Sequence, residues 1–298
     1  MASVCPENVG VPTPRRLLAV HAHPDDEASK GAATTARYAA AGVEVLVVTC
    51  TGGERGDVLN PALDRPEITA SLPSVRRAEM AEAASILGVR HAWLGFIDSG
   101  WSDATPAAPP PAGSFADVPM EEPALSLLRI VRAFRPHVLT TYDENGGYPH
   151  PDHLRTHEIS RYVWEHAGDR SRHPAAGPAW TPLKLYYHHS FHRERLMALH
   201  EAVIATGQPS PYAEWLADRA DDSHRVTTRV RCAEYFPVRE RALLAHATQV
   251  PPTSAWFTVP AHVQAEIWPT EDYELAATRV PVSLPEDDLF AGVPDDIA

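Results

Sequence analysis

The sequence predicts one α/β domain built on a Rossmann-like, mostly parallel sheet with helices on both faces. Three observations lead to this class. Strand-like and helix-like segments alternate through the first 160 residues, which is the rhythm of parallel strands joined by crossover helices. The strand-like segments are apolar nearly throughout, as expected of strands covered on both faces. With 298 residues, 44% apolar and 22% charged, the chain has ordinary globular composition and enough length for a substantial core.

The first strand, over 16–23, is a buried apolar run, and an Ala-rich helix over 31–42 follows it and stops at a glycine. A β-branched run over 43–50 predicts the second strand. The later elements continue the alternation: a helix over 74–88, a short strand over 91–96, a helix over 123–136, a strand over 137–143 and a helix that begins near Asp152.

After residue 183 the alternation weakens. We expect strands in "LKLYYHHSF" and "RVTTRVRC" and helices in "RERLMALHEAVIATG" and "VRERALLAHATQ". Residues 1–183 are expected to form the α/β core that carries the metal-binding motifs described below. Residues 184–298 are expected to be a C-terminal extension of the same domain that walls the active site and completes the substrate pocket.

Charge and cysteine content narrow the classes of partner. The net charge of −13 disfavours nucleic acid and anionic membrane surfaces as partners. No apolar run approaches the roughly 20 residues that span a bilayer, and the N-terminal stretch lacks the apolar core of a signal peptide. Cys5, Cys50 and Cys232 are far apart, so neither a disulfide framework nor a thiolate metal site is expected. We expect a cytoplasmic enzyme that acts on a small molecule; the oligomeric state stays open.

Titratable groups crowd into "HAHPDDE", residues 21–27, directly after the first predicted strand. In isolation, Asp25, Asp26 and Glu27 would be interpreted as acids that cap a helix N-terminus, where the helix dipole favours negative charge. That interpretation leaves His23, at the end of a buried strand, unexplained. A histidine and an aspartate three residues apart can direct a nitrogen and an oxygen at one ion. We therefore predict that His23 and Asp26 bind a metal ion, that Asp25 points elsewhere and that Glu27 only supports the helix terminus.

A second cluster, "ENGGYPHPDHLRTH" over 144–157, follows the strand predicted at 137–143. Its glycines make a tight turn, and its prolines stiffen the path into a helix. His150 and His153 are three residues apart and can share a helix face, with His157 deeper on the same face. Ligands of parallel sheets bind outside the carboxyl ends of the strands. Because both clusters follow strand ends, we expect them to meet there and to share one metal site.

Two histidines and one carboxylate form a three-ligand site with an open position, the arrangement that catalytic zinc uses. Fe(II) suits the same ligands. A metal ion there polarises a carbonyl and acidifies a water molecule. Asp25, which is not needed as a ligand, is placed to accept the water's proton, and Tyr148 and His150 are placed to stabilise a tetrahedral oxyanion. The residues alone therefore predict metal-assisted hydrolysis of an acyl compound.

Together, these motifs resemble the zinc N-deacetylases of the PIG-L/LmbE type, which hydrolyse amides of glucosamine derivatives. The two segments around "AHPDDE" and "HPDH" carry the specific part of the resemblance. It spans nearly the whole chain through "VTCTGGERGDVLNP", "WLGFIDSG", "RALLAHATQV" and "WPTEDYELA". These segments are most similar to the branch of the family that acts on mycothiol S-conjugates.

The resemblance implies zinc bound by His23, Asp26 and His153, with Asp25 as general base. It implies that Tyr148 and His150 stabilise the oxyanion or protonate the leaving amine, and that Asp152 orients a neighbouring histidine. The implied substrate contacts are Lys30, Asp57, Arg76 and Asp98. The amidases typically carry Ser where this chain has Ala28, and Glu is frequent where it has Asp57; neither position is an implied ligand.

Lys30 helps to distinguish the amidase branch of the family from the glucosaminyl deacetylases. The chain has 24 arginines and only two lysines. A lysine kept at this position indicates that the site requires a compact ammonium group rather than a guanidinium. The amidase branch carries Lys in this "SKG" context, whereas the glucosaminyl deacetylases resemble "SNG". The resemblance therefore implies cleavage of the cysteinyl–glucosamine amide of a mycothiol S-conjugate, which releases an N-acetylcysteine S-conjugate and glucosaminyl-inositol.

Three alternatives remain from the sequence. The enzyme could deacetylate N-acetylglucosaminyl-inositol, or it could be a biosynthetic relative that hydrolyses a mycothiol adduct of a natural product. A binding protein without catalysis is disfavoured because His23, Asp25, Asp26 and His153 are all present.

Other residues that could suggest a site are given structural roles. We expect His188, His189 and His192 to line the pocket rim rather than to bind a second metal. His246 is expected to be a core histidine, and Cys50 a small buried hydrophobe rather than a nucleophile. The tryptophans at 215, 256 and 268 are interpreted as packing residues.

Overall fold

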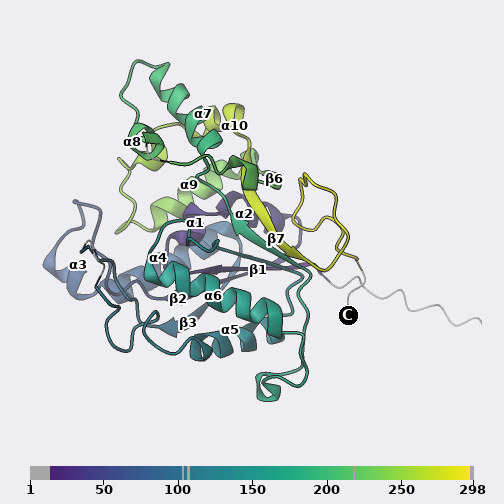
Figure 1. Ribbon diagram of the computed structural model, residues 1–298. Coiled ribbons are helices and arrows are strands. Elements are labelled where there is room, and N and C mark those ends of the chain that lie inside the picture. Colours follow the sequence, from purple (N-terminus) through teal and green to yellow (C-terminus); the bar gives the residue numbers. More distant parts are fainter. Residues whose placement is uncertain (1–13, 103, 106–107, 218, 296–298) are drawn as a thin grey trace, which may run out of the picture.

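In the part of the chain that the structure describes, seven strands form one sheet in the order β3-β2-β1-β4-β5-β7-β6 (Figure 1). The computed structural model describes residues 14–102, 104, 105, 108–217 and 219–295, so Cys5 and the rest of the N-terminal stretch lie outside the described residues. The strands are β1 (Arg16–His21), β2 (Glu44–Thr51), β3 (Arg90–Phe96), β4 (Val138–Thr141), β5 (Lys184–His188), β6 (Thr228–Arg231) and β7 (Thr270–Thr278).

Helices alternate with these strands along the chain. They are α1 (Asp26–Ser29), α2 (Ala32–Ala40), α3 (Pro66–Ala70), α4 (Leu72–Leu87), α5 (Glu121–Phe134), α6 (Pro151–His166), α7 (Arg193–Ile204), α8 (Tyr212–Ala217), α9 (Phe236–Ala245) and α10 (Ala261–Ile267). Short 3₁₀ turns occur at η1 (Pro174–Ala176), η2 (Ser223–Arg225), η3 (Ala233–Tyr235) and η4 (Ala255–Phe257).

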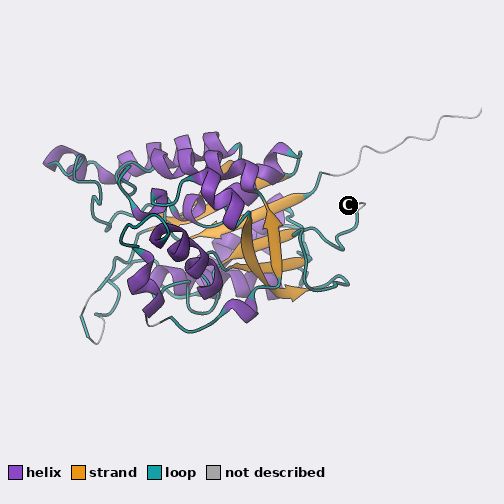
Figure 2. Cartoon of the chain, turned by 90° about the horizontal axis from the view of Figure 1, so that it is seen from above, coloured by secondary structure: helices purple, strands orange, loops and turns teal. Residues whose placement is uncertain are grey.

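The predicted fold class is confirmed. Strands β1 to β5 pair in parallel, and only β7 runs antiparallel to its neighbours β5 and β6. Helices cover both faces of the sheet (Figure 2). On one face, Leu18 of β1 packs with Leu127 of α5 and Ile159 of α6. On the other, Ala19 of β1 packs with Met80 of α4, and α9 packs against α2 and α4.

Strand β7 was not predicted, because its acidic residues break the apolar pattern of a buried strand. Both Glu271 and Asp272 are nevertheless buried. The carboxylate of Glu271 accepts hydrogen bonds from the backbone N–H groups of Ala33 and Thr34 at the start of α2. The carboxylate of Asp272 lies 2.9 Å from Nε2 of His192. Partners from distant segments thus compensate the burial of these charges.

The order of the strands defines where ligands bind. From β1 the chain crosses to β2 on one side, whereas β4 pairs with β1 on the other. The strand order therefore reverses between β1 and β4, and open α/β sheets bind ligands at the carboxyl ends of the strands at such a point. Within the described residues, no helix is both long and apolar enough to cross a bilayer.

Candidate metal centre

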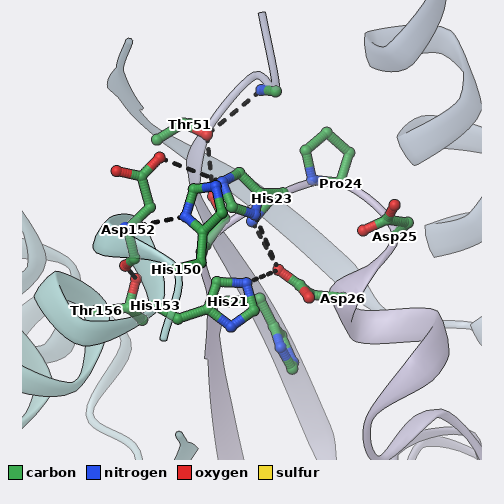
Figure 3. A network of polar contacts seen from close by, with 12 residues as sticks. His21, His23, Pro24, Asp25, Asp26, Thr51, His150, Asp152, His153 and Thr156 are labelled. Carbon is green, nitrogen blue, oxygen red and sulfur yellow. Dashed lines mark hydrogen bonds and ion pairs between the residues drawn. The ribbon is translucent and has the colours of Figure 1, made fainter. Parts of the chain in front are cut away.

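The candidate ligands lie in the segments that follow β1 and β4. Strand β1 ends at His21, and His23 follows it at the carboxyl edge of the sheet, just before α1 begins at Asp26. From the other side, α6 begins at Pro151 and carries His153 in its first turn. Proline suits this position because the first N–H groups of a helix have no intrahelical acceptor. In Figure 3 the side chains of His23 and His153 converge on the carboxylate of Asp26.

The carboxylate of Asp26 lies between the two imidazoles. Its Oδ2 is 3.5 Å from Nδ1 of His23 and 3.4 Å from Nε2 of His153. The same oxygen accepts a hydrogen bond of 2.9 Å from the backbone N–H of His23. All three side chains are buried, and one possible ligand atom of each lies within 4.8 Å of the others. This donor set matches a three-ligand catalytic metal site with an open position.

The protonation of His153 shows that the site fits a cation. Its Nδ1 lies 2.8 Å from the carbonyl oxygen of Gly146, which can only accept, so Nδ1 carries the proton and Nε2 carries a lone pair. Nε2 is buried and has no hydrogen-bond partner among the described residues. A buried lone pair without a donor is costly. Metal-binding histidines characteristically donate their second ring N–H to a backbone carbonyl in this way.

Asp152 supports His23 from the opposite side. Its Oδ2 lies 3.2 Å from Nε2 of His23 and also accepts a hydrogen bond from the backbone N–H of Ser99. His23, His150 and Asp152 form a second group with ligand spacing. In that group, however, Nδ1 of His150 accepts from the backbone N–H of Asp152, so that lone pair is already used. The contacts favour His23, Asp26 and His153 as ligands, with Asp152 orienting His23.

Asp25 has a strained backbone beside these ligands. Its φ of 109° is unusual for a residue with a Cβ and costs on the order of 1–3 kcal/mol. Two side chains hold this conformation. The backbone N–H of Asp25 donates to Oε2 of Glu27 at 3.0 Å, and Arg76 donates to the carbonyl of Pro24 at 2.6 Å. Burial raises the pKa of the Asp25 carboxyl, and Arg76 opposes that rise, so Asp25 is a stronger base than an exposed aspartate.

Glu27 and His246 form a buried ion pair that sequence reasoning missed. Nε2 of His246 lies 2.6 Å from Oε1 of Glu27, and both side chains are almost completely buried. Burial alone would raise the pKa of Glu27, but His246 lowers it overall. Glu27 is therefore not a solvated acid at a helix terminus. His246 lies in the core as predicted, but only its Nε2 is paired, since the buried Nδ1 has no hydrogen-bond partner among the described residues. The partner of Nε2 is the residue that anchors Asp25.

A polar cleft of about 340 Å³ opens beside the ligands. We define it by six of its lining residues: Asp25, Asp57, Arg76, Asp98, Tyr148 and His150. Among the predicted substrate contacts, Asp57 is exposed, whereas Arg76 and Asp98 are buried. Arg76 donates to the carbonyls of Pro24 and Gly53, so much of its guanidinium is engaged by the protein. Asp98 accepts from the backbone N–H groups of Arg55 and Gly100.

Lys30 lines a different cavity rather than this cleft. Its Nζ donates to Oδ1 of Asp26 at 2.7 Å, which leaves Oδ2 toward His23 and His153. The side chain also lines a second cavity, described below. The geometry thus gives Lys30 a contact with a candidate ligand, in addition to the predicted contact with substrate.

Tyr148 and His150 line the polar cleft as hydrogen-bond donors. Because Nδ1 of His150 accepts from the backbone of Asp152, its Nε2 carries the proton. Burial and the neighbouring His23 lower the pKa of His150 to about 4, so the ring is neutral at physiological pH. Partial burial and the charge of Asp26 raise the pKa of Tyr148, so its phenol keeps its proton.

The remaining predictions concern side chains outside the ligand set. Cys50 is buried, and burial raises the pKa of its thiol, in agreement with a packing role. His157 lies 3.1 Å from the carbonyl oxygen of Tyr142, which orders the loop before α6. His188, His189 and His192 line the second cavity.

Comparison with known proteins identifies the family. The PIG-L family model, described as GlcNAc-PI de-N-acetylase, matches residues 18–164. The mycothiol S-conjugate amidase of Streptomyces coelicolor is 53% identical over 94% of this chain and 98% of its own length. A 1D-myo-inositol 2-acetamido-2-deoxy-alpha-D-glucopyranoside deacetylase of Geodermatophilus obscurus is 37% identical, over 94% of this chain and 98% of its own.

Solved structures agree on the fold. The N,N'-diacetylchitobiose deacetylase of Pyrococcus horikoshii superposes with a TM-score of 0.60 at 18% identity, covering 88% of this chain and 83% of that one. The fold, the buried His–Asp–His group and these relatives define the class of protein, an amidase or deacetylase that hydrolyses amide bonds. The chain belongs to the PIG-L family.

Proposed function

We propose that the protein is a zinc-dependent cytoplasmic amidase that cleaves the cysteinyl–glucosamine amide of mycothiol S-conjugates. The products are an N-acetylcysteine S-conjugate and glucosaminyl-inositol. The observation that carries this proposal is the 53% identity to a mycothiol S-conjugate amidase over nearly the full length of both chains, against 37% to a deacetylase of similar length. The charge of −13 also favours a small molecule over nucleic acid as the partner.

His23, Asp26 and His153 would hold the metal ion. A divalent ion bound there supplies Lewis acidity, which polarises the amide carbonyl and acidifies the attacking water. Zinc is the proposed ion, and Fe(II) is the alternative, since two imidazoles and a carboxylate suit both. Asp152 and Gly146 fix the orientation of the two imidazoles through their second ring nitrogens.

Asp25 acts as the general base. It lines the polar cleft beside the ligands, and its raised pKa suits a group that takes a proton from water and returns it to the leaving amine. The C–O bond forms first and gives a tetrahedral oxyanion. When the oxyanion collapses, the C–N bond breaks, and the proton that Asp25 removed from water passes to the leaving amine. Neutral His150 and the phenol of Tyr148 donate hydrogen bonds to the developing oxyanion.

The amine half of the substrate occupies the polar cleft. Asp25, which gives a proton to the leaving nitrogen, and His150, which donates a hydrogen bond to the oxyanion, both line this cleft. The charged side chains of Asp57, Arg76 and Asp98 offer hydrogen bonds to the hydroxyl groups of a sugar and an inositol. Lys30 contacts the candidate metal ligand Asp26.

A substrate comparison tests the proposal. The kcat/KM of the purified protein on a mycothiol S-conjugate should exceed that on N-acetylglucosaminyl-inositol, and a chelator should abolish both activities. Preferential deacetylation would instead support the alternative that the related deacetylases suggest. If protein freed of metal kept full activity, the metal mechanism would be wrong.

Replacement of the base separates catalysis from metal binding. Asp25→Asn should retain the metal content of the wild type while kcat falls by about 10²–10⁴-fold, the usual contribution of a general base. Metal analysis of protein purified without air identifies the ion. The assay of Asp25→Asn loaded with that ion then tests the role of the carboxylate.

A further inference from the structure

Two more cavities are lined by Lys30 or by its neighbour Ser29. The histidine cavity, of about 360 Å³, is lined by Lys30, Tyr142 and His188, among others. The aromatic pocket, of about 160 Å³, is lined by Phe191, Trp215 and Trp256, among others, with contributions from α7, α8 and η4. The catalytic roles proposed above involve the polar cleft and leave the aromatic pocket unused.

The two cavities are neighbours and reach toward the metal centre. Ser190 and Phe191 line both of them. Ser29 lines the aromatic pocket and the next residue, Lys30, lines the histidine cavity. Lys30 donates to both the hydroxyl of Ser29 and the carboxylate of Asp26. One short segment thus connects a candidate metal ligand with the walls of both cavities.

The aromatic pocket has the size and chemistry to take a ring. The ring of Phe191 lies 5.3 Å from that of Trp256 and 6.0 Å from that of Trp215, between centroids, distances at which aromatic rings attract one another. A cavity of about 150 Å³ with apolar walls holds one benzene molecule. The aromatic pocket has a similar volume, and beside its aromatic and aliphatic walls it is also lined by Arg195, Arg239, Gln264 and Glu271. Trp215 and Trp256 therefore do more than pack the fold, because they also shape a space with room for one ring.

Along this path, two buried side chains carry polar atoms that have no hydrogen-bond partner among the described residues. Arg195, on α7, is 8% exposed and donates Nη1 to the carbonyl of Ser190, but its buried Nε–H has no acceptor among the described residues. Both ring nitrogens of His188, which is also 8% exposed, are without hydrogen-bond partners in the described chain. Unpaired buried polar groups are costly and indicate a ligand that supplies their partners.

We propose that the acyl half of the substrate runs through the histidine cavity and that the substituent on its sulfur ends in the aromatic pocket. The inference rests on the proposed amidase function. The leaving amine is placed in the polar cleft, where Asp25 and His150 lie, so the acyl half extends to the opposite side of the scissile carbonyl. The amide of the N-acetylcysteinyl group pairs with His188, and the aromatic pocket selects conjugates whose substituent is an aromatic ring.

Selectivity between two substrates tests this placement. We would compare kcat/KM for the S-benzyl and S-methyl conjugates of mycothiol, using metal-loaded full-length protein. The wild type should prefer the benzyl conjugate, and Trp256→Ala should lower the benzyl-to-methyl ratio about 10-fold or more, as loss of contacts in an apolar pocket does. Trp256→Phe, which keeps a ring, should retain most of the preference.

A matched control and a binding measurement complete the test. Leu244→Ala changes an exposed side chain on α9, next to Leu243 of the aromatic pocket, and should leave the ratio unchanged. Free S-benzyl-N-acetylcysteine should inhibit the wild type more strongly than its S-methyl analogue, and Trp256→Ala should remove that difference.

The outcomes separate this inference from the proposed function. If both conjugates were hydrolysed rapidly and Trp256→Ala left the benzyl-to-methyl ratio of kcat/KM unchanged, the proposed role of the aromatic pocket would be wrong, whereas the amidase function would stand. If neither conjugate were hydrolysed while N-acetylglucosaminyl-inositol was deacetylated, both the proposed function and the acyl-side placement would be wrong.

Discussion

At the scale of single residues, Asp25 depends on a side chain from the far end of the chain. His246 is 219 residues from Glu27 in sequence, and Glu27 in turn accepts from the backbone of Asp25. Asp25, the proposed general base, is thus held by a buried charge pair.

His246→Ala should destabilise the protein by about 3–5 kcal/mol, because it leaves the Glu27 carboxylate buried and unpaired. The free energy of unfolding in urea measures this loss. His224→Ala, at an exposed histidine, is the control and should change stability little. Equal effects of the two variants would contradict the role of the pair.

Substituting Lys30 tests whether it orients the metal ligand Asp26 or contacts the substrate. If its contact with Oδ1 of Asp26 orients the ligand, Lys30→Met should weaken metal affinity about 10–100-fold, as loss of an outer partner usually does. Competition with a chelator of known affinity measures this change. Unchanged metal affinity together with a higher KM for the S-conjugate would show that Lys30 acts as a substrate contact instead.

At the scale of elements, the loop between β4 and α6 depends on one glycine. Gly146 has a φ of +70°, and a Cβ there would lie 2.7 Å from Cβ of His153 and 2.8 Å from the carbonyl oxygen of Tyr148. Its own carbonyl oxygen accepts a hydrogen bond from Nδ1–H of His153. The segment "NGG" therefore positions a candidate ligand through its backbone.

Gly146→Ala should displace His153 and lower metal affinity and activity together. Gly147→Ala is the matched control, since Gly147 has nearly the same φ of +73° but open space around its Cα. The control should cost only about 1–2 kcal/mol of left-handed backbone strain and should retain metal. Metal content and urea unfolding of both variants show whether Gly146→Ala acts by displacing His153 or only by backbone strain.

At the scale of the whole molecule, the second lysine joins the C-terminal segment to the sheet. Lys184 of β5 is fully buried and donates to Oε1 of Glu286 at 2.6 Å. The hydroxyl of Tyr186, also on β5, donates to Oε2 of Glu286 at 2.7 Å. Both lysines of the protein thus pair with buried carboxylates, which a compact ammonium group suits.

Lys184→Met should destabilise the protein by about 3–5 kcal/mol, because Glu286 is left as an uncompensated buried charge. The double variant Lys184→Met/Glu286→Leu should recover much of that loss. Arg229→Met breaks an exposed ion pair with Glu194 and should cost no more than about 1 kcal/mol. In the folded state, kcat should be that of the wild type for all three proteins.

Local patterns were sufficient to predict the parallel core. The apolar runs of β1 and β2 and the glycine stop after α4 depend on neighbours in sequence, so they are visible without tertiary structure. The same holds for the two ligand clusters, because a His–Asp motif directly after a strand reaches the carboxyl edge of any parallel sheet. The structure brings His23, Asp26 and His153 together as that logic expects.

The sequence by itself therefore determined the fold class and the residues that gather at the carboxyl ends of β1 and β4. Only the tertiary structure decided that β7 is a strand, that Glu27 pairs with His246, that Lys30 contacts Asp26 and that two cavities lie beyond it. The physical reason is the same in each case. Periodicity and helix stops act between near neighbours, whereas the burial of a charge is favourable only when packing brings a partner from a distant segment.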